Sequence, residues 1–373
     1  MRIVVTGADG FIGSNLSVRL RELPQSEVVG ITSSTARQEF EAALGAANFV
    51  FHLAGVNRPK DEAEFVNGNV ELTKSVCAVL AASGRRTPVA YASSVQATLE
   101  NAYGRSKRAA EEVLLQYGRD SGAPVQLFRL TNVFGKWCRP YYNSVVATFC
   151  HQVAQGMPIT VDNPATSLRL LHVDDLVAAF VRLLGAGHLQ TGYVEAGPVY
   201  ETTVGELAHT LREIADSRNS LLIPRVGVGL TRALYCTYMS YLQPDAFAYK
   251  VPRHTDPRGV FVEMLKTPDC GQVSYFTAHR GVTRGEHYHH SKTEKFLLIR
   301  GTARFAFRNI RTGQTHELIV RGDEGCIVES VPGWAHNITN IGEDELIVML
   351  WANEVLDRAR PDTVAMRVAH EEA

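Results

Sequence analysis

Gly281-Val-Thr-Arg-Gly-Glu-His287-Tyr-His289-His290-Ser-Lys-Thr-Glu294 is the stretch that determines how this 373-residue chain is interpreted. On a β-strand, His287 and His289 would point to the same side, because side chains alternate between the two faces of a strand. Glu294 follows five residues after His289, and His336 lies further along the chain. Three imidazoles and one carboxylate suit zinc, iron, nickel or manganese. The sequence therefore predicts a site for one divalent metal ion, and zinc is the metal we expect.

The spacing of these residues matches a known pattern. Gly281 and Gly301 frame the histidines as Gly-x5-His-x-His-x4-Glu-x6-Gly, and Gly333, His336 and Asn340 follow as Gly-x2-His-x3-Asn. The two segments resemble the sequence motifs of the cupin family. A loop of surface histidines is the simpler alternative, but it does not explain the framing glycines. The resemblance implies an all-β, double-stranded β-helix domain that holds the metal.

Composition describes an ordinary soluble globular protein of two or three domains. Its 38 Lys and Arg residues and 39 Asp and Glu residues are interspersed, so no basic patch indicates binding to nucleic acid or an anionic membrane. No apolar run is long enough for a membrane span, and the chain starts without the layout of a signal peptide. Its six cysteines lack Cys-x-x-Cys pairing, which is typical of reduced thiols. We expect a cytoplasmic protein with no nucleic-acid or membrane partner.

A glycine-rich segment near the N-terminus predicts a nucleotide cofactor. An apolar strand over residues 1–6 leads into Gly7-Ala-Asp-Gly10-Phe11-Ile12-Gly13, and a helical pattern follows. Such a turn lets backbone amides and the helix N-terminus approach a pyrophosphate closely. The spacing is Gly-x2-Gly-x2-Gly rather than Gly-x-Gly-x2-Gly. The predicted cofactor contacts in this turn are Gly7, Gly10, Phe11, Ile12 and Gly13.

The residues at the end of the second predicted strand, over residues 28–32, indicate whether the cofactor is NAD or NADP. An acidic residue about twenty positions after the last glycine would hold the ribose hydroxyls of NAD, whereas hydroxyls and an arginine suit the 2′-phosphate of NADP. Here the strand ends in Thr32-Ser33-Ser34-Thr35-Ala36-Arg37. Ser33 and Arg37 therefore predict NADPH. A solvated helix residue with no cofactor contact is the alternative interpretation of Arg37.

Three polar residues predict a proton-transfer site. An apolar strand beginning at Val89 ends in Ser93-Ser94, and open α/β sheets bind ligands at the carboxyl ends of their strands. Tyr103 and Lys107 lie one turn apart on a predicted helix. A lysine ammonium lowers the pKa of a neighbouring phenol, which can then protonate the alkoxide formed by hydride addition. We predict Tyr103 as proton donor, Lys107 as its partner and Ser94 as the hydroxyl that orients the carbonyl, with Ser93 as the alternative.

Together with His52-Leu53-Ala54-Gly55 after a further apolar strand, these residues resemble the extended short-chain dehydrogenase/reductase family that acts on nucleotide sugars. The resemblance implies a Rossmann-type, doubly wound parallel sheet. It places His52, Leu53, Ala54 and Lys107 beside the cofactor. The interval between Ser94 and Tyr103 is shorter than in many relatives. The implied contacts to the UDP-sugar are Asn132, Arg139, Asn143 and Arg169, the last three with surface or packing roles as the alternative.

The pattern changes after about residue 245, where short alternating strands separated by turns begin. We predict a reductase domain over residues 1–245 and a cupin domain over residues 246–373. The segment from Asp256 to Glu263, Asp-Pro-Arg-Gly-Val-Phe-Val-Glu, resembles the 3,5-epimerases of dTDP-4-keto sugars, which are also cupins. That resemblance implies that Arg258 and Glu263 contact the nucleotide sugar. A buried ion pair between them is the alternative.

The whole chain resembles the bifunctional capsular polysaccharide enzymes of the UDP-N-acetyl-L-fucosamine pathway. A ketone at C4 accepts hydride and also acidifies the C–H bond at C3, so one 4-keto sugar serves both activities. The resemblance implies that UDP-2-acetamido-2,6-dideoxy-L-arabino-hexos-4-ulose is epimerised at C3 and then reduced at C4 with NADPH. The product would be UDP-2-acetamido-2,6-dideoxy-L-talose, made by a homodimer.

Two alternatives stay open. In one, the cupin domain of a reductase only binds ligand or mediates dimerisation. In the other, the chain is a non-enzymatic NADP-sensing protein, against which Tyr103 and Lys107 argue. The acid and base for C3 are unresolved among His290, Lys295 and Tyr275.

Overall fold

The computed structural model spans Met1 to Ala373 and describes residues 1–256, 259–262, 264–265, 267, 271–354 and 359–368. Backbone contacts divide the chain into two compact units, which we describe separately. Unit 1 contains residues 1–133 and 169–199, and unit 2 contains residues 134–168 and 200–373. Within the described ranges, no helix combines the length and apolarity that a membrane crossing requires.

Unit 1 is built on a six-stranded sheet in which every neighbouring pair is parallel. Its strands, in spatial order, are β2 (Glu27–Ile31), β1 (Arg2–Thr6), β3 (Phe49–His52), β4 (Val89–Ser94), β5 (Val125–Leu130) and β8 (Gly192–Tyr193). The four central strands are almost continuously apolar, as expected when helices cover both faces of a parallel sheet.

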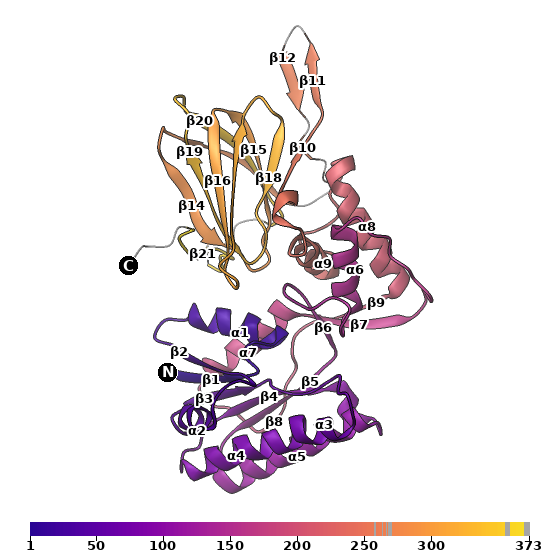
Figure 1. Ribbon diagram of the computed structural model, residues 1–373, viewed down its shortest axis with the longest axis vertical. Helices are drawn as coiled ribbons and strands as arrows, with labels where there is room; N and C mark the ends of the chain where they lie inside the picture. Colours follow the sequence, from indigo (N-terminus) through magenta and orange to yellow (C-terminus); the bar gives the residue numbers. More distant parts are fainter. Residues whose placement is uncertain (257–258, 263, 266, 268–270, 355–358, 369–373) are drawn as a thin grey trace. The chain divides into compact units, whose positions relative to one another are not determined.

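Helices flank both faces of this sheet (Figure 1). They are α1 (Phe11–Arg21), α2 (Arg37–Gly45), α3 (Ala63–Phe65), η1 (Val66–Glu71), α4 (Leu72–Ala82), η2 (Val95–Thr98), α5 (Ala102–Ser121) and α7 (Val173–Leu184). Val4 of β1 packs with α2, α4 and α5, whereas its neighbours Ile3 and Val5 pack with α1 and α7. This alternation gives two apolar cores, one on each face, which is the doubly wound arrangement.

Three short strands form a separate sheet of order β6 (Asn132–Phe134), β7 (Ser167–His172) and β9 (Val199–Thr203). Unit 2 adds the helices α6 (Val145–Ala154), α8 (Val204–Ser220), α9 (Gly229–Met239) and η3 (Pro244–Ala246). Helix α8 begins with a capping box, in which the Thr203 hydroxyl accepts from the Glu206 amide and the Glu206 carboxylate accepts from the Thr203 amide.

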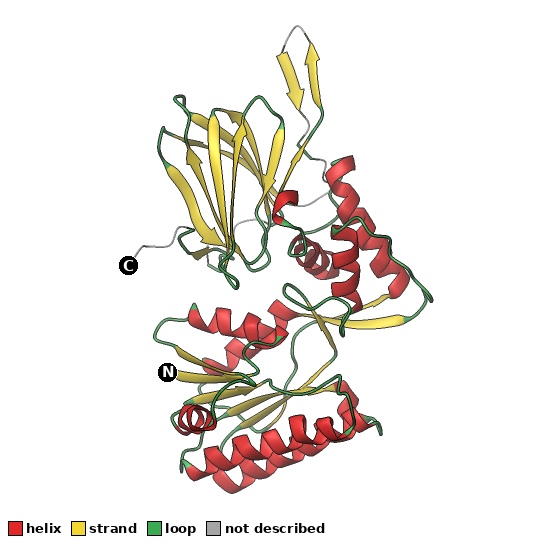
Figure 2. Cartoon of the chain, viewed as in Figure 1, coloured by secondary structure: helices red, strands yellow, loops and turns green. Residues whose placement is uncertain are grey.

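The remainder of unit 2 is a β-sandwich, coloured yellow in Figure 2. One antiparallel sheet has the order β10 (Ala248–Lys250), β18 (Cys326–Glu329), β15 (Glu294–Arg300), β20 (Leu346–Ala352) and β13 (Gln272–Ala278). The other has the order β17 (Thr315–Arg321), β16 (Thr302–Asn309), β19 (Trp334–Asn340), β14 (Thr283–Tyr288) and β21 (Val364–Ala365). A hairpin pairs β11 (Arg253–Asp256) with β12 (Gly259–Val262).

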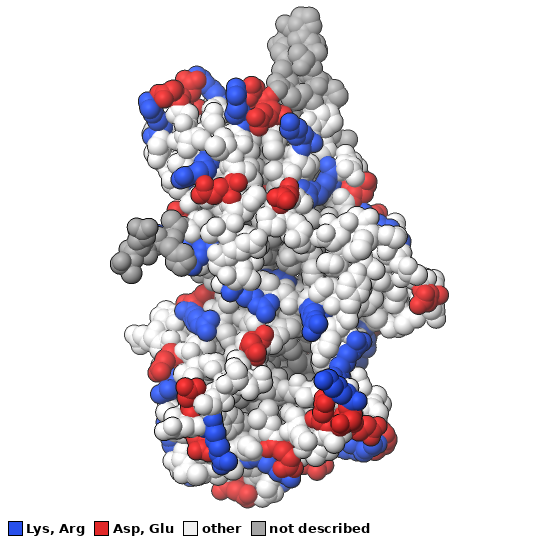
Figure 3. Space-filling view, in the orientation of Figure 1, with Lys and Arg blue, Asp and Glu red and all other residues white. Residues whose placement is uncertain are grey.

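These two architectures confirm the predicted fold class, a Rossmann-type parallel sheet followed by a cupin-like all-β domain. The predicted boundary between residues 245 and 246 stays a prediction about sequence domains. In space it lies inside unit 2, because α6, α8 and α9 group with the β-sandwich. On the face shown in Figure 3, basic and acidic side chains are intermixed.

Candidate functional site

Glycines close the turn between β1 and α1 where side chains would not fit. Gly7 has a φ of +67°, and a Cβ there would lie 2.9 Å from the backbone of Ala54. A Cβ at Gly13 would lie 2.0 Å from the Gly7 carbonyl oxygen. Helix α1 starts after Gly10 without a side-chain cap, so the first amides, including those of Phe11–Ile12, face outward from the helix end. This geometry fits the predicted pyrophosphate contacts.

The end of β2 carries the residues expected to select NADP. Ser33 is exposed in the turn before α2. Arg37 opens α2 with its side chain 91% exposed, and its Nε atom lies 2.8 Å from the Glu41 carboxylate one turn later. An exposed ion pair of this kind is weak, so the Arg37 guanidinium can exchange partners.

His52 is fully buried and is bonded through both ring nitrogens. The Thr73 hydroxyl donates to the Asn69 carbonyl at 2.6 Å, so its oxygen accepts from His52 Nε2 at 2.9 Å. The Thr6 hydroxyl accepts from the amides of Leu53–Ala54 and donates to His52 Nδ1 at 2.7 Å. Burial, followed by the charge of a nearby lysine, lowers the pKa of His52 to about 3. The His52 side chain therefore holds the loop after β3, and a cofactor there would meet the loop backbone.

Ser94, Tyr103 and Lys107 gather at the carboxyl end of β4. Ser94 ends β4, and its side chain lies close enough to the Tyr103 phenol to lower the pKa of that phenol. The neighbouring Ser93 hydroxyl instead donates to the buried Glu111 carboxylate. Of the two serines left open by the sequence, Ser94 is therefore the one beside the predicted proton donor.

The Lys107 ammonium has hydrogen-bond partners that were not predicted from the sequence. Its Nζ atom donates to the Ala92 carbonyl at 2.9 Å and to the Tyr91 hydroxyl at 3.3 Å. Burial lowers the pKa of Lys107 to about 8, although a buried glutamate on the same helix opposes this. Burial raises the pKa of Tyr103, and the nearby Ser94 side chain only partly opposes this shift. Burial therefore dominates the Tyr103 pKa in this arrangement, and the lowering of that pKa by Lys107 stays a prediction.

A hydrogen-bond network around Glu111 was not predicted from the sequence. Its carboxylate lies 3.0 Å from Arg129 Nε and 2.6 Å from an Arg129 terminal nitrogen, and it accepts from the Tyr193 hydroxyl at 3.0 Å. Burial alone would raise the pKa of Glu111, but the bonds from Arg129 and Ser93 lower it overall. The available signal was its position four residues after Lys107, on the same helix face.

The predicted substrate residues have different placements. Asn132 and Arg169 belong to unit 1 and are exposed. Arg139 and Asn143 belong to unit 2 and are also exposed, with the Arg139 guanidinium 5.5 Å from the centre of a tyrosine ring. The remaining predictions, Arg258 and Glu263, lie outside the described residues.

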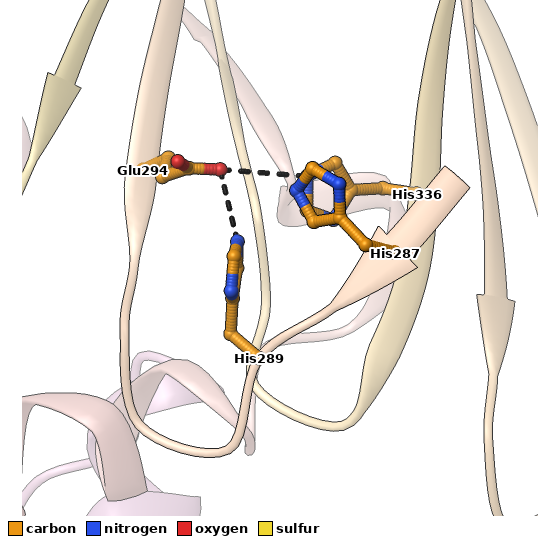
Figure 4. Close-up of side chains that lie close together, drawn as sticks. All are labelled: His287, His289, Glu294 and His336. Atoms are coloured by element: carbon orange, nitrogen blue, oxygen red, sulfur yellow. Dashed lines mark hydrogen bonds and ion pairs between the residues drawn. The ribbon is translucent and has the colours of Figure 1, made fainter. Parts of the chain in front are cut away.

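The four predicted metal ligands converge between the two sheets of unit 2 (Figure 4). His287 on β14 is paired with His336 on β19, and a β-bulge immediately before His287 sets this register. The bulge contains Gly285 and Glu286, which both have positive φ. His289 follows the end of β14. The fourth ligand candidate, Glu294, opens β15 in the opposite sheet.

The donor atoms have the spacing of a metal site. All four lie within 4.8 Å of one another. The Glu294 carboxylate is 3.1 Å from His289 Nε2 and 3.5 Å from His336 Nε2. Ligands about 2.0–2.2 Å from a tetrahedral zinc ion would be separated by about 3.3–3.6 Å. The buried donor set therefore fits one divalent ion.

The pKa shifts of His287, His336 and Glu294 also fit metal binding. Burial, together with nearby His336 and His289, lowers the pKa of His287 to about 4. Burial also lowers the pKa of His336. Burial would raise the pKa of Glu294, but its bonds with His289 and His336 hold it well below the usual range. Neutral imidazoles and an ionised carboxylate are the forms that bind metals.

Lys295 lies on the other side of β15 from the metal cluster. It directly follows Glu294, so its side chain points to the opposite face of the strand. There its buried ammonium is paired with Glu329 and donates to the Tyr249 hydroxyl at 2.9 Å. These contacts argue against Lys295 as the base at C3. Of the other two candidates, Tyr275 is exposed on β13, and His290 directly follows a predicted ligand.

Family comparisons match both parts of the chain. Residues 3–193 match the NAD dependent epimerase/dehydratase family, and residues 254–364 match the polysaccharide biosynthesis C-terminal domain.

Relatives extend this similarity over the full length. A Pseudomonas aeruginosa protein named UDP-2-acetamido-2,6-beta-L-arabino-hexul-4-ose reductase is 53% identical over 368 residues, covering 99% of each chain. The crystal structure of the capsular polysaccharide assembling protein CapF from Staphylococcus aureus is 38% identical with a TM-score of 0.68, covering 99% of this chain and 100% of that one. The structure of RMD from Pseudomonas aeruginosa complexed with NADPH is 26% identical with a TM-score of 0.50, over 58% of this chain and 85% of that one.

Proposed function

Because this chain belongs to the NAD dependent epimerase/dehydratase family and continues into a polysaccharide biosynthesis C-terminal domain, we propose that it is a bifunctional nucleotide-sugar enzyme. The cupin-like part epimerises C3 of UDP-2-acetamido-2,6-dideoxy-L-arabino-hexos-4-ulose. The Rossmann-type part then reduces C4 with NADPH and forms UDP-2-acetamido-2,6-dideoxy-L-talose. The full-length relative named as a reductase of the arabino-hexul-4-ose sugar supports this choice of substrate.

The observation that carries the reductase activity is the contact of Ser94 with Tyr103 beside the buried Lys107. Bound NADPH supplies the hydride. The Ser94 hydroxyl orients the C4 carbonyl, and the Tyr103 phenol donates its proton to the alkoxide oxygen as the C4–H bond forms. Lys107 provides a positive charge that stabilises the phenolate left behind.

NADPH rather than NADH is supported by the residues after β2. No acidic residue occurs from Thr32 to Arg37, and the exposed Arg37 can turn to a 2′-phosphate. The structural relative RMD, complexed with NADPH, supports the same cofactor.

The chemistry fixes the order of the two steps. The C4 ketone acidifies the C3–H bond, and reduction removes that acidity, so epimerisation comes first. His287, His289, Glu294 and His336 would hold a zinc ion, which would supply Lewis acidity to the C3 epimerisation or would maintain the shape of the pocket. The homodimer and the cytoplasmic location stay predictions.

Two measurements test whether C4 reduction and C3 epimerisation use separate sites. NADPH oxidation reports C4 reduction, and deuterium uptake from D2O reports proton exchange at C3. Tyr103→Phe should oxidise NADPH about 10²- to 10⁴-fold more slowly, because the proton donor is lost, and should still exchange C3.

Tyr117→Phe is the matched control. Tyr117 lies on the same helix, and its hydroxyl donates to the Thr87 carbonyl at 3.0 Å, so both activities should persist. Equal loss of C3 exchange and NADPH oxidation in folded Tyr103→Phe would refute separate sites.

A further inference from the structure

Asp362 binds the loop that follows a predicted metal ligand, His289. One carboxylate oxygen accepts from the His290 amide at 2.9 Å. The other accepts from the amides of Ser291 at 2.7 Å and Lys292 at 2.8 Å, and from the Ser291 hydroxyl at 3.1 Å. Three consecutive backbone amides therefore point at one carboxylate. These hydrogen bonds restrict the conformations that the loop can adopt.

The backbone of Asp362 contacts the ligand itself. Its carbonyl oxygen is hydrogen-bonded to His289 Nδ1. A carbonyl can only accept, so the proton must be on Nδ1. That tautomer leaves Nε2 as the nitrogen facing Glu294, 3.1 Å from the carboxylate. The same residue thus fixes both the loop and the ring of His289.

The segment continues along the first ligand strand. Strand β21 pairs with His287–Tyr288 at the end of β14, and Figure 1 shows the two strands side by side. Beyond β21, the Met366 amide donates to the Glu286 carbonyl at 2.8 Å, and the Val368 amide donates to the Glu286 carboxylate at 2.8 Å. The other Glu286 oxygen accepts from Asn337 on β19 at 2.8 Å.

We propose that Asp362 is a positioning residue for the metal centre, and that the segment from Asp362 to Val368 holds His287 and His289 in binding geometry. The inference rests on the metal centre of the proposed function and adds to it a structural element remote in sequence from every ligand. Outer partners that orient metal-binding histidines raise affinity because the ligands are arranged before the metal arrives.

Zinc affinity of the full-length chain tests this inference. The apo chain is prepared by dialysis against a chelator and titrated with Zn²⁺ in competition with a chromophoric chelator. Asp362→Asn should bind zinc about ten- to hundredfold more weakly. The new amide nitrogen cannot accept hydrogen bonds, so it cannot replace the oxygen that meets Ser291 and Lys292. The visible spectrum of the Co²⁺-loaded variant should also change, because that spectrum depends on ligand geometry.

Asp323→Asn is the matched control. Asp323 is an exposed residue of the same unit, 3.4 Å from Arg321, and this variant should bind zinc like the unaltered chain. Glu286→Gln tests the far end of the segment, where one acceptor for Val368 or Asn337 is lost. It should weaken zinc binding several-fold, and it serves as the deciding variant if Asp362→Asn lowers the melting temperature of the apo chain.

The outcomes separate the inference from the proposed function. Unchanged zinc affinity and an unchanged cobalt spectrum in Asp362→Asn overturn the inference while leaving the metal centre in place. If Asp362→Asn does not fold, unchanged affinity in Glu286→Gln overturns it. If the unaltered chain binds no zinc, the metal centre and this inference both fail, while NADPH-dependent reduction is still measured independently.

Discussion

At the scale of single residues, we expect Lys107 to make the proposed reductase site sensitive to pH. Its ammonium is buried beside Tyr91, with His52, Tyr103 and Glu111 as the other titratable groups around it. Because burial lowers its pKa to about 8, Lys107 is charged below this pH and neutral above it. Tyr103 behaves in the opposite way, since burial raises its pKa and keeps the phenol protonated.

We therefore expect kcat/KM for NADPH oxidation to fall as pH rises through about 8, approaching tenfold per pH unit. Lys107→Arg should be less active at neutral pH, but its activity should hold to higher pH because a guanidinium stays charged. A kcat/KM profile from about pH 6 to 10 for both proteins measures the effect. A decline at the same pH in Lys107→Arg would assign the titration to another group.

Spacing in the sequence predicted the candidate residues that the structure brings together, but not the residues that contact and support them. Tyr103 and Lys107 are four residues apart, and the predicted metal ligands His287, His289 and Glu294 fall within eight consecutive positions. Glu111 and Asp362 act through partners distant along the chain, including Arg129 and the loop after His289. No periodic pattern marks such pairings, so they became visible only in the folded chain.

At the scale of elements, the short interval between Ser94 and Tyr103 is filled by the helical turn η2. Ser94 caps this turn by accepting from the Gln96 amide at 3.1 Å. Asn101 caps α5 by accepting from the Gly104 amide at 2.7 Å. A turn of four residues is too short to show helical periodicity, so it could not be predicted.

Gly104 allows α5 to begin close to this turn. A Cβ there would lie 2.2 Å from the Gln96 carbonyl oxygen and 2.6 Å from that of Leu99, both of them backbone atoms. Gly104→Ala should therefore displace the start of α5 and the neighbouring Tyr103. We expect about 1–3 kcal/mol lower free energy of unfolding and NADPH oxidation reduced more than tenfold. Urea titration and the NADPH assay measure the two effects.

Gly45→Ala is the control for this substitution, because a Cβ at Gly45 in α2 meets nothing within 4 Å. It should leave the rate unchanged and the stability equal or slightly higher. A Gly104→Ala protein with normal stability and normal activity would show that α5 can shift without disturbing the site.

The strand that carries the first predicted metal ligand was predicted only in part. His287 and His289 lie near each other as expected, with ring centroids 4.9 Å apart. However, β14 ends at Tyr288, so His289 belongs to the following loop. The bulge at Gly285–Glu286 aligns His287 with His336, and such irregularities depend on the partner strand.

At the scale of the whole molecule, the sequence correctly predicted the family to which the chain belongs. The predicted similarity to capsular polysaccharide enzymes is confirmed by the match to CapF and by the two family matches. The grouping of two helices with the β-sandwich was not predicted from the sequence. Helices α8 and α9 precede the cupin-like segment, yet they belong to unit 2. A buried ion pair between residues distant along the chain links α8 to the β-sandwich.

Glu329 contacts two buried cations. Its carboxylate on β18 pairs with the Lys295 ammonium on β15, and it lies 3.3 Å from the Arg218 guanidinium on α8. All three side chains are largely buried. Replacing the carboxylate would leave two cations buried without their anion, and removing one partner of a buried pair destabilises by about 3–5 kcal/mol.

Glu329→Gln should therefore destabilise unit 2 selectively. Zinc binds the folded form of unit 2 in our proposal, so added zinc should raise the melting temperature of the unit 2 transition and identify it in calorimetry. Glu329→Gln should lower that transition and leave the zinc-insensitive one in place. The control Glu317→Gln, at an exposed position on β17, should change neither by more than about 0.5 kcal/mol. If Glu329→Gln lowers both transitions equally, the two units unfold as one, and the buried charges stabilise the whole chain rather than unit 2.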